Sequence, residues 1–212
     1  MPPRKRIFLL SPANLSGVRA GYLLVDNAKS NLACRLRSGG VALGEVFAFI
    51  SGLYFRGKLV YAQSFCASPD DLPGLFVITS SEGLLVPDAL VTLERLQEWA
   101  AYRIDAGEKH FRVPLERDCR LLSSRMGESC DVVLLGSIAT AKYASPLLEI
   151  FRERLLFPAD FVGRGDMSRG GLMLRSFATG KELEYIPVLN ATLRGPRPPR
   201  LLPVKARPPS MR

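Results

Sequence analysis

The sequence predicts an α/β fold, a three-layer sandwich in which helices cover both faces of a mostly parallel sheet. Short, continuous apolar runs recur along the chain and are typical of strands buried on both faces. Segments with helical spacing of apolar residues separate these runs, which favours parallel strands joined by helices. The chain has 212 residues, of which 47% are hydrophobic, enough for a single domain with a substantial core.

The N-terminal half begins with a strand and continues with helices. Residues 7–10 form an apolar run, which predicts a buried first strand. Apolar residues at helical spacing predict a helix over 15–25, for which Asn14 is a candidate N-cap. Further helices are expected over 29–38 and 43–66, and glycines within the second of these predict a bend.

The C-terminal half alternates strands with helices. Strands are expected at residues 75–79, 131–135, 155–157 and, at a sheet edge, 184–189. Helices are expected at residues 92–101, 114–126 and 140–154. Thr92 and Pro114 suit the first turns of two of these helices. Four glycines within 163–171 predict a loop, followed by a short helix over 172–177.

Basic residues concentrate at the two ends of the chain. The net charge is +9, yet residues 7–193 contain equal numbers of basic and acidic residues. The excess lies in an N-terminal arm, residues 1–6, and in an Arg/Pro-rich tail, residues 194–212, which we expect to be disordered. Such arms bind DNA or RNA by counterion release without reading sequence; the alternative is that they only aid solubility. A single α/β domain is expected over 7–193.

The remaining composition points to an intracellular protein. The four cysteines are widely spaced, with no CxxC pair, which favours buried free thiols in a reducing compartment over a disulfide framework or a zinc site. We assign no metal ligand, and nothing in the sequence identifies a cofactor. No uninterrupted apolar run reaches the roughly 18 residues of a membrane span, and the N-terminal run is too short for a signal peptide. We therefore expect a cytoplasmic protein with no membrane partner.

Polar side chains follow two of the expected strands. They are Ser11, Asn14 and Arg19 after the first strand, and Ser137, Thr140 and Lys142 after strand 131–135. In open α/β sheets, ligands bind beyond the carboxyl ends of the strands. Free N–H groups, the helix dipole, hydroxyls and a lysine at the second of these positions suit a phosphate or a carboxylate. The alternative is an ordinary helix start, with Thr140 as its cap and Lys142 in solvent.

The glycine-rich stretch 163–171 supplies a second group of candidates. It carries Arg164, Asp166, Ser168 and Arg169. The two arginines would clamp a phosphate or carboxylate, and Asp166 would act as a general acid or base. Glu82 and Asp88 are the other candidates for that acid or base role. The alternative for Arg164 and Asp166 is a weak surface ion pair in a turn.

Aromatic and basic residues alternate in one predicted helix. Tyr54 and Phe55 precede Arg56 and Lys58, a combination that suits a nucleobase stacked beside a phosphate. The alternative is an amphipathic helix whose aromatic rings pack inward while Arg56 and Lys58 lie in solvent. His110 is the only histidine and there is no GxSxG motif, which disfavours a Ser-His-Asp hydrolase.

Four short motifs carry a resemblance to a known family. They are Leu10-Ser11-Pro12, the stretch from Ser51-Gly52-Leu53-Tyr54-Phe55 to Tyr61-Ala62, Ile78-Thr79-Ser80-Ser81-Glu82-Gly83-Leu84-Leu85-Val86-Pro87-Asp88, and the strand before Tyr143. Over much of residues 7–175 the chain resembles bacterial and phage α/β domains of the YaaA, or peroxide-stress, type. The resemblance implies the same fold and a nucleic-acid or nucleobase context. The chain differs in having Glu82 where such domains carry a basic residue.

Together these features predict a protein that binds, or acts on, a nucleotide or nucleic acid. The phosphate would lie at Ser137 to Lys142 and beside Arg164 and Arg169, with a base stacked near Tyr54. Two alternatives stay open. The first is a non-catalytic module that its basic tails recruit to nucleic acid or to an acidic partner, and the second is a metabolic enzyme for a small carboxylate or phosphate ester.

Overall fold

A computed structural model describes residues 4–139, 141–191, 195–196, 198–199 and 201. Thr140 lies outside the described residues. Most of the expected tail, residues 194–212, also lies outside them.

A six-stranded sheet forms the centre of the molecule, with the strand order β4-β3-β1-β6-β7-β8. Its strands are β1 (Lys5–Leu10), β3 (Leu75–Ile78), β4 (Leu84–Leu85), β6 (Cys130–Leu135), β7 (Leu155–Pro158) and β8 (Tyr185–Pro187). The four inner strands are parallel, and the short edge strands β4 and β8 run antiparallel to them. Leu10 at the end of β1 pairs with Val77 on one side and with Leu135 on the other. The prediction of an α/β fold around a mostly parallel sheet is confirmed.

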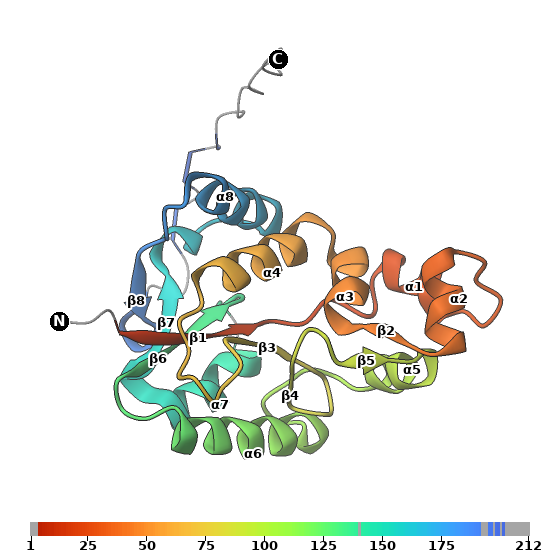
Figure 1. The fold of residues 1–212 in the computed structure, drawn as a ribbon, viewed down its shortest axis with the longest axis horizontal. Helices are drawn as coiled ribbons and strands as arrows, with labels where there is room; N and C mark the ends of the chain where they lie inside the picture. The colour runs from red at the N-terminus through yellow and green to blue at the C-terminus, as the bar shows by residue number, and fades with distance from the viewer. Residues whose placement is uncertain (1–3, 140, 192–194, 197, 200, 202–212) are drawn as a thin grey trace, which may run out of the picture.

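Helices cover both faces of this sheet, and Figure 1 shows the resulting layers. One layer contains α4 (Leu53–Phe65) and α8 (Asp166–Thr179), and the other contains α6 (Lys109–Arg125) and α7 (Ala141–Phe151). The remaining helices gather beyond the carboxyl end of β1 (Figure 1). They are α1 (Val18–Leu24), α2 (Asn31–Ser38), α3 (Leu43–Ser51) and α5 (Leu93–Ala101), beside the small sheet of β2 (Val41–Ala42) and β5 (Leu90–Val91). Short 3-10 turns occur at η1 (Arg152–Arg154), η2 (Ala159–Phe161) and η3 (Val188–Asn190).

The central strands form the middle of the hydrophobic core. The apolar residues of β1 from Ile7 to Leu10, and those of β6 from Val132 to Leu135, are completely buried. Their continuous apolar sequence follows from burial on both faces. The four cysteines are free thiols, of which Cys119 and Cys130 are buried and Cys34 is exposed.

Several elements begin at residues other than those expected. Helix α6 begins at Lys109, and Pro114 lies inside it. Helix α1 begins at Val18 with Gly17 as its N-cap, because the Asn14 side chain instead accepts hydrogen bonds from the Ser16 N–H and hydroxyl in a local turn. Strand β1 begins at Lys5. Two residues of the expected N-terminal arm are therefore part of the sheet.

The predicted loop over 163–171 is wrong, because α8 begins at Asp166 and includes two of the glycines. Gly170 is helical because it lies against α4. A Cβ atom at position 170 would lie 2.8 Å from the Leu53 carbonyl oxygen, and one at Gly57 would lie 2.8 Å from the Gly170 carbonyl oxygen. These glycines allow two helix backbones to approach closely, and they do not make a flexible loop.

Candidate functional site

A cavity of about 530 Å³ opens at the carboxyl ends of β1 and β6. After β1 the chain forms β3 on one side of it and later forms β6 on the other side. This reversal of strand order leaves a crevice between the loops that follow the two strands, which is where open α/β sheets bind ligands. The cavity lies at the edge of the sheet that the sequence predicts for ligand binding.

Six of the predicted site residues line this cavity. They are Ser11, Asn14, Tyr54, Ser137, Lys142 and Asp166. Ser51, Ser16 and Tyr143 also line it, and none of these three is among the predicted site residues. Hydroxyl groups and a lysine therefore make up much of the wall, and Asp166 provides a carboxylate from the start of α8.

Lys58 lies beneath the cavity. Its side chain is completely buried, and its Nζ donates to the carbonyl oxygen of Ser11 at 2.5 Å and to the Ser11 hydroxyl at 2.9 Å. The alternative that places Lys58 in solvent is wrong, because this position of α4 faces β1 and not the exterior. Burial lowers the pKa of Lys58 to about 7, while the charge of Asp166 acts to raise it and that of Arg169 acts to lower it.

Tyr54 belongs to the cavity wall but does not offer an open ring for stacking. The residue is only 6% exposed, and the Lys58 ammonium lies 4.6 Å from its ring centroid. Its buried hydroxyl has no hydrogen-bond partner among the described residues. Burial raises the pKa of this hydroxyl, so Tyr54 stays neutral at physiological pH. The structure therefore does not support stacking of a base on Tyr54.

The loop after β6 is packed closely against the end of β1. A Cβ atom on Gly136 would lie 2.9 Å from the Ser11 Cβ atom, so glycine is required for the two strand ends to meet. The next N–H, that of Ser137, donates to the Tyr143 hydroxyl at 3.1 Å. Burial raises the pKa of Tyr143, against the opposing effect of hydrogen bonds with Ser137 and Ser11. Lys142 is exposed in the first turn of α7.

The two predicted arginines have different surroundings. Arg169 is buried and donates to the carbonyl oxygens of Phe161, at 3.1 and 3.2 Å, and of Gly136, at 3.5 Å. It thus ties α8 to the loop after β6 and contributes positive charge below the cavity. Arg164 and Ser168 line a neighbouring recess of about 770 Å³, which Asp166 also lines. Arg164 donates to the Ser168 hydroxyl at 3.3 Å.

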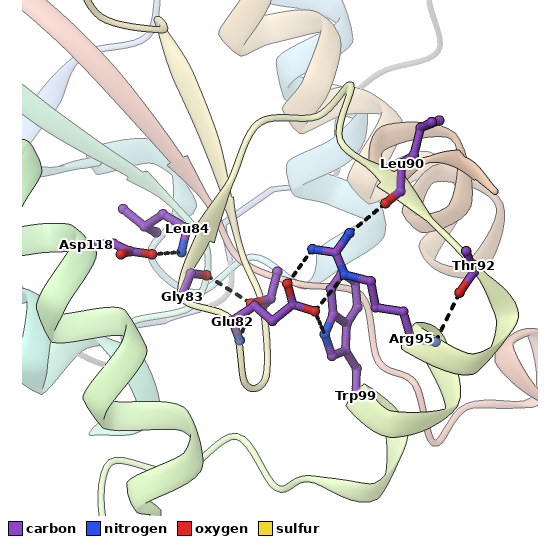
Figure 2. A network of polar contacts seen from close by, with 9 residues as sticks. Glu82, Gly83, Leu84, Leu90, Thr92, Arg95, Trp99 and Asp118 are labelled. Carbon is purple, nitrogen blue, oxygen red and sulfur yellow. Dashed lines mark hydrogen bonds and ion pairs between the residues drawn. The ribbon is translucent and has the colours of Figure 1, made fainter. Parts of the chain in front are cut away.

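Arg19 and Glu82 lie outside the cavity. Arg19 is exposed and packs over Gly52, where its Nη1 would lie 2.5 Å from an added Cβ atom. Glu82, in the turn between β3 and β4, accepts hydrogen bonds from Arg95 Nε at 2.6 Å and from Trp99 Nε1 at 2.8 Å (Figure 2). Hydrogen bonding by Arg95 lowers the pKa of Glu82. With its oxygens engaged away from the cavity, Glu82 is not placed to act as its acid or base.

Glu82→Gln is expected to lower the free energy of unfolding by about 1 kcal/mol at pH 7, because the half-buried carboxylate loses charge-assisted hydrogen bonds. The folded-state pKa is lowered, so this stabilisation is complete above the unfolded pKa near 4.5 and is lost as pH falls below it. Urea unfolding at several pH values measures both effects. Exposed Glu128 is the matched control, and an equal loss in Glu128→Gln would contradict a specific role for the Glu82 network.

The charges around the cavity favour an anionic ligand. Lys142 is at the wall and buried Arg169 lies beneath it, whereas Asp166 is the one carboxylate among the lining residues that are described. Buried positive charge acts strongly on a ligand because little water screens it.

The described part of the chain has no helix with the length and apolarity that crossing a membrane requires. Comparisons with family models, with curated proteins and with solved structures gave no match to this chain.

Proposed function

We propose that the cavity binds the phosphate-bearing part of a nucleotide or of a similar phosphorylated sugar compound. The observation that carries the proposal is the convergence of hydroxyl groups, an exposed lysine and buried positive charge at the strand-order reversal. The cavity volume of about 530 Å³ falls within the range usual for sites that hold small ligands and cofactors.

The start of α7 is the best position for the phosphate. Helix N-termini attract anions through free N–H groups and the helix dipole. Lys142, in the first turn, adds a full positive charge, and Ser137 adds a hydroxyl at the end of β6. A phosphate at this point would lie between the loops after β1 and β6.

Asp166 supports the sugar side of the same ligand. It lines the cavity at the first residue of α8, and an ionised carboxylate is an acceptor for sugar hydroxyls. If the protein is an enzyme, Asp166 can also exchange a proton with a bound hydroxyl or base. Asp166→Asn is then expected to abolish turnover while binding is retained.

Lys142→Ala is expected to weaken binding of adenosine 5′-monophosphate about tenfold, because one charge-assisted hydrogen bond to the phosphate is lost. Titration calorimetry with the full chain measures the dissociation constant. Lys181→Ala is the matched control. This exposed lysine follows the C-terminal end of α8, whereas the cavity lies at the N-terminal end of that helix. Adenosine and inorganic phosphate, titrated separately, divide the affinity between the two parts of the ligand.

Other outcomes would contradict the proposal in identifiable ways. Equal binding of adenosine and its monophosphate would show that the phosphate is not recognised. Binding of single-stranded DNA that is indifferent to Lys142→Ala and disappears at high salt would instead support recruitment by the basic ends of the chain.

A further inference from the structure

A serine and a lysine form a close pair at the floor of the cavity. The Ser11 Oγ and Lys58 Nζ atoms are 2.9 Å apart. Ser11 is 5% exposed and lines the cavity, whereas Lys58 is completely buried behind it. Ser11 therefore borders the cavity directly. Lys58 does not line the cavity and contacts it only by way of its hydrogen bond to Ser11.

We infer that Ser11 is a nucleophile toward carboxylic esters and that Lys58 is its general base. This activity goes beyond the proposed binding function and does not depend on it. Serine hydroxyls are weak nucleophiles until a base removes their proton, and Ser-Lys pairs are a known alternative to histidine-dependent triads. The absence of a suitable histidine therefore does not exclude serine chemistry in this chain.

The base must be neutral to accept the proton. Lys58 lies in an apolar environment under the rings of Tyr54 and Phe55, at 4.6 and 4.8 Å from their centroids. Desolvation there lowers its pKa to about 7, so a large fraction of Lys58 is the free amine near neutral pH. Asp166 and Arg169, both from α8, act on this pKa in opposite directions. A neutral amine still donates to the Ser11 carbonyl oxygen and accepts from the Ser11 hydroxyl.

The reaction requires only the ester and water. The Ser11 oxygen forms a bond to the acyl carbon while its proton moves to Lys58 Nζ. The tetrahedral intermediate then collapses, the bond to the leaving alcohol breaks, and the alcohol takes the proton from Lys58. Water releases the acyl group by the same route.

Tyr143 is positioned to stabilise the oxyanion of this intermediate. It lines the cavity, and its hydroxyl oxygen accepts the Ser137 N–H at 3.1 Å. Its hydroxyl also hydrogen-bonds with Ser11, so its proton can turn from Ser11 to the oxyanion as the intermediate forms. Because burial raises the pKa of Tyr143, that proton is retained at neutral pH. Such donors stabilise the negative charge that develops during acyl transfer.

A fluorophosphonate reagent tests the pair directly. Attack by Ser11 forms a bond to phosphorus and expels fluoride, and Lys58 takes the serine proton. Trypsin releases the segment between Arg6 and Arg19, which contains both Ser11 and Ser16. Fragmentation mass spectrometry of this peptide is expected to locate the adduct on Ser11. The labelling rate is expected to rise with pH with a midpoint near 7, as Lys58 loses its proton.

Variants separate a catalytic role of the pair from a structural one. Ser11→Ala is expected to abolish the adduct, and Lys58→Met and Lys58→Arg are each expected to slow labelling about 100-fold, the lower end for loss of a general base. Exposed Ser124 and Lys181 provide the controls Ser124→Ala and Lys181→Met, which should label at the wild-type rate. If a Lys58 variant fails to fold, the pH dependence of the wild-type labelling rate still tests whether Lys58 is the base.

Several results would overturn the inference. They are the absence of an adduct, an adduct on Ser16, a rate that does not depend on pH between 6 and 8, and a folded Lys58 variant that labels normally. Labelling is measured without nucleotide, so it is independent of the binding proposal. If adenosine 5′-monophosphate does not bind but Ser11 is labelled, the binding proposal fails and the nucleophile stands.

Discussion

Gly170→Val is expected to lower the free energy of unfolding by about 4 kcal/mol, the range of severe overpacking in a core. A Cβ atom at position 170 would lie 2.8 Å from the Leu53 carbonyl oxygen and 2.9 Å from the Tyr54 Cα atom. Both neighbours are backbone atoms of α4, so no side chain can move aside. Helix α8 must separate from α4, and Asp166 and Arg169 move with it. Chemical denaturation followed by circular dichroism measures the loss.

The adjacent glycine provides a matched control in the same helix. A Cβ atom on Gly171 would meet nothing closer than Leu201 Cδ1, at 3.6 Å, an ordinary contact distance. Gly171→Ala is therefore expected to leave the free energy of unfolding unchanged or to raise it by up to about 1 kcal/mol, because alanine favours a helix interior. A loss in Gly171→Ala as large as that in Gly170→Val would contradict the proposed close contact between the two helices.

Lys58→Met is expected to stabilise the protein by about 2 kcal/mol at pH 6. A buried lysine must either be desolvated while charged or lose its proton, and an apolar side chain of similar length avoids both costs. Methionine leaves the Ser11 carbonyl oxygen without its present donor, which offsets part of the gain. Urea unfolding of the two proteins in parallel measures the difference.

The stability difference between wild type and Lys58→Met should also depend on pH. The pKa of Lys58 is about 7 in the folded state, against 10.5 for an unperturbed lysine. Between these values the unfolded state binds more protons, so the stability of the wild type rises with pH. The rise due to Lys58 between pH 7 and 9 is expected to be about 2 kcal/mol, and the variant should lack it. A pH-independent difference would show that Lys58 remains charged when folded.

The predictions for Gly170 and Lys58 both concern the surface of α4 that lies next to the cavity. The buried lysine costs stability, and glycines bring α8 close enough to α4 to hold Asp166 and Arg169 near the cavity. Groups that destabilise a fold without an evident structural gain occur most often at functional sites. A measured gain in stability in Lys58→Met would therefore support a chemical role for the Ser11–Lys58 pair.

The central strands could be predicted from the sequence because they are buried on both faces. Ile7 to Leu10 and Val132 to Leu135 are continuous apolar runs, and no helical spacing competes with that pattern. The short strands β2, β4 and β5 have two residues each, too few for a periodicity to be detected. The helix at 166–179 was obscured by its glycines, whose role depends on α4, a contact distant in sequence.

The candidate site could be predicted in part, for a topological reason. Ser11, Asn14, Ser137 and Lys142 directly follow predicted strands, and parallel strands bring their carboxyl ends to one edge. Lys58 gave no comparable signal, because a lysine in an amphipathic helix normally faces water. Its burial depends on how α4 crosses the sheet, which local sequence does not specify.

The edges of the sheet limit how the folded protein can associate with other chains. Strand β4 has two residues and β8 has three, the last of them Pro187. Edges this short, one of them ending in a residue that lacks a backbone N–H, leave few groups on which a foreign strand could pair. Aggregation of this protein should therefore start from partly unfolded chains that expose the apolar sequence of β1 or β6, and conditions that stabilise the native state should also suppress it.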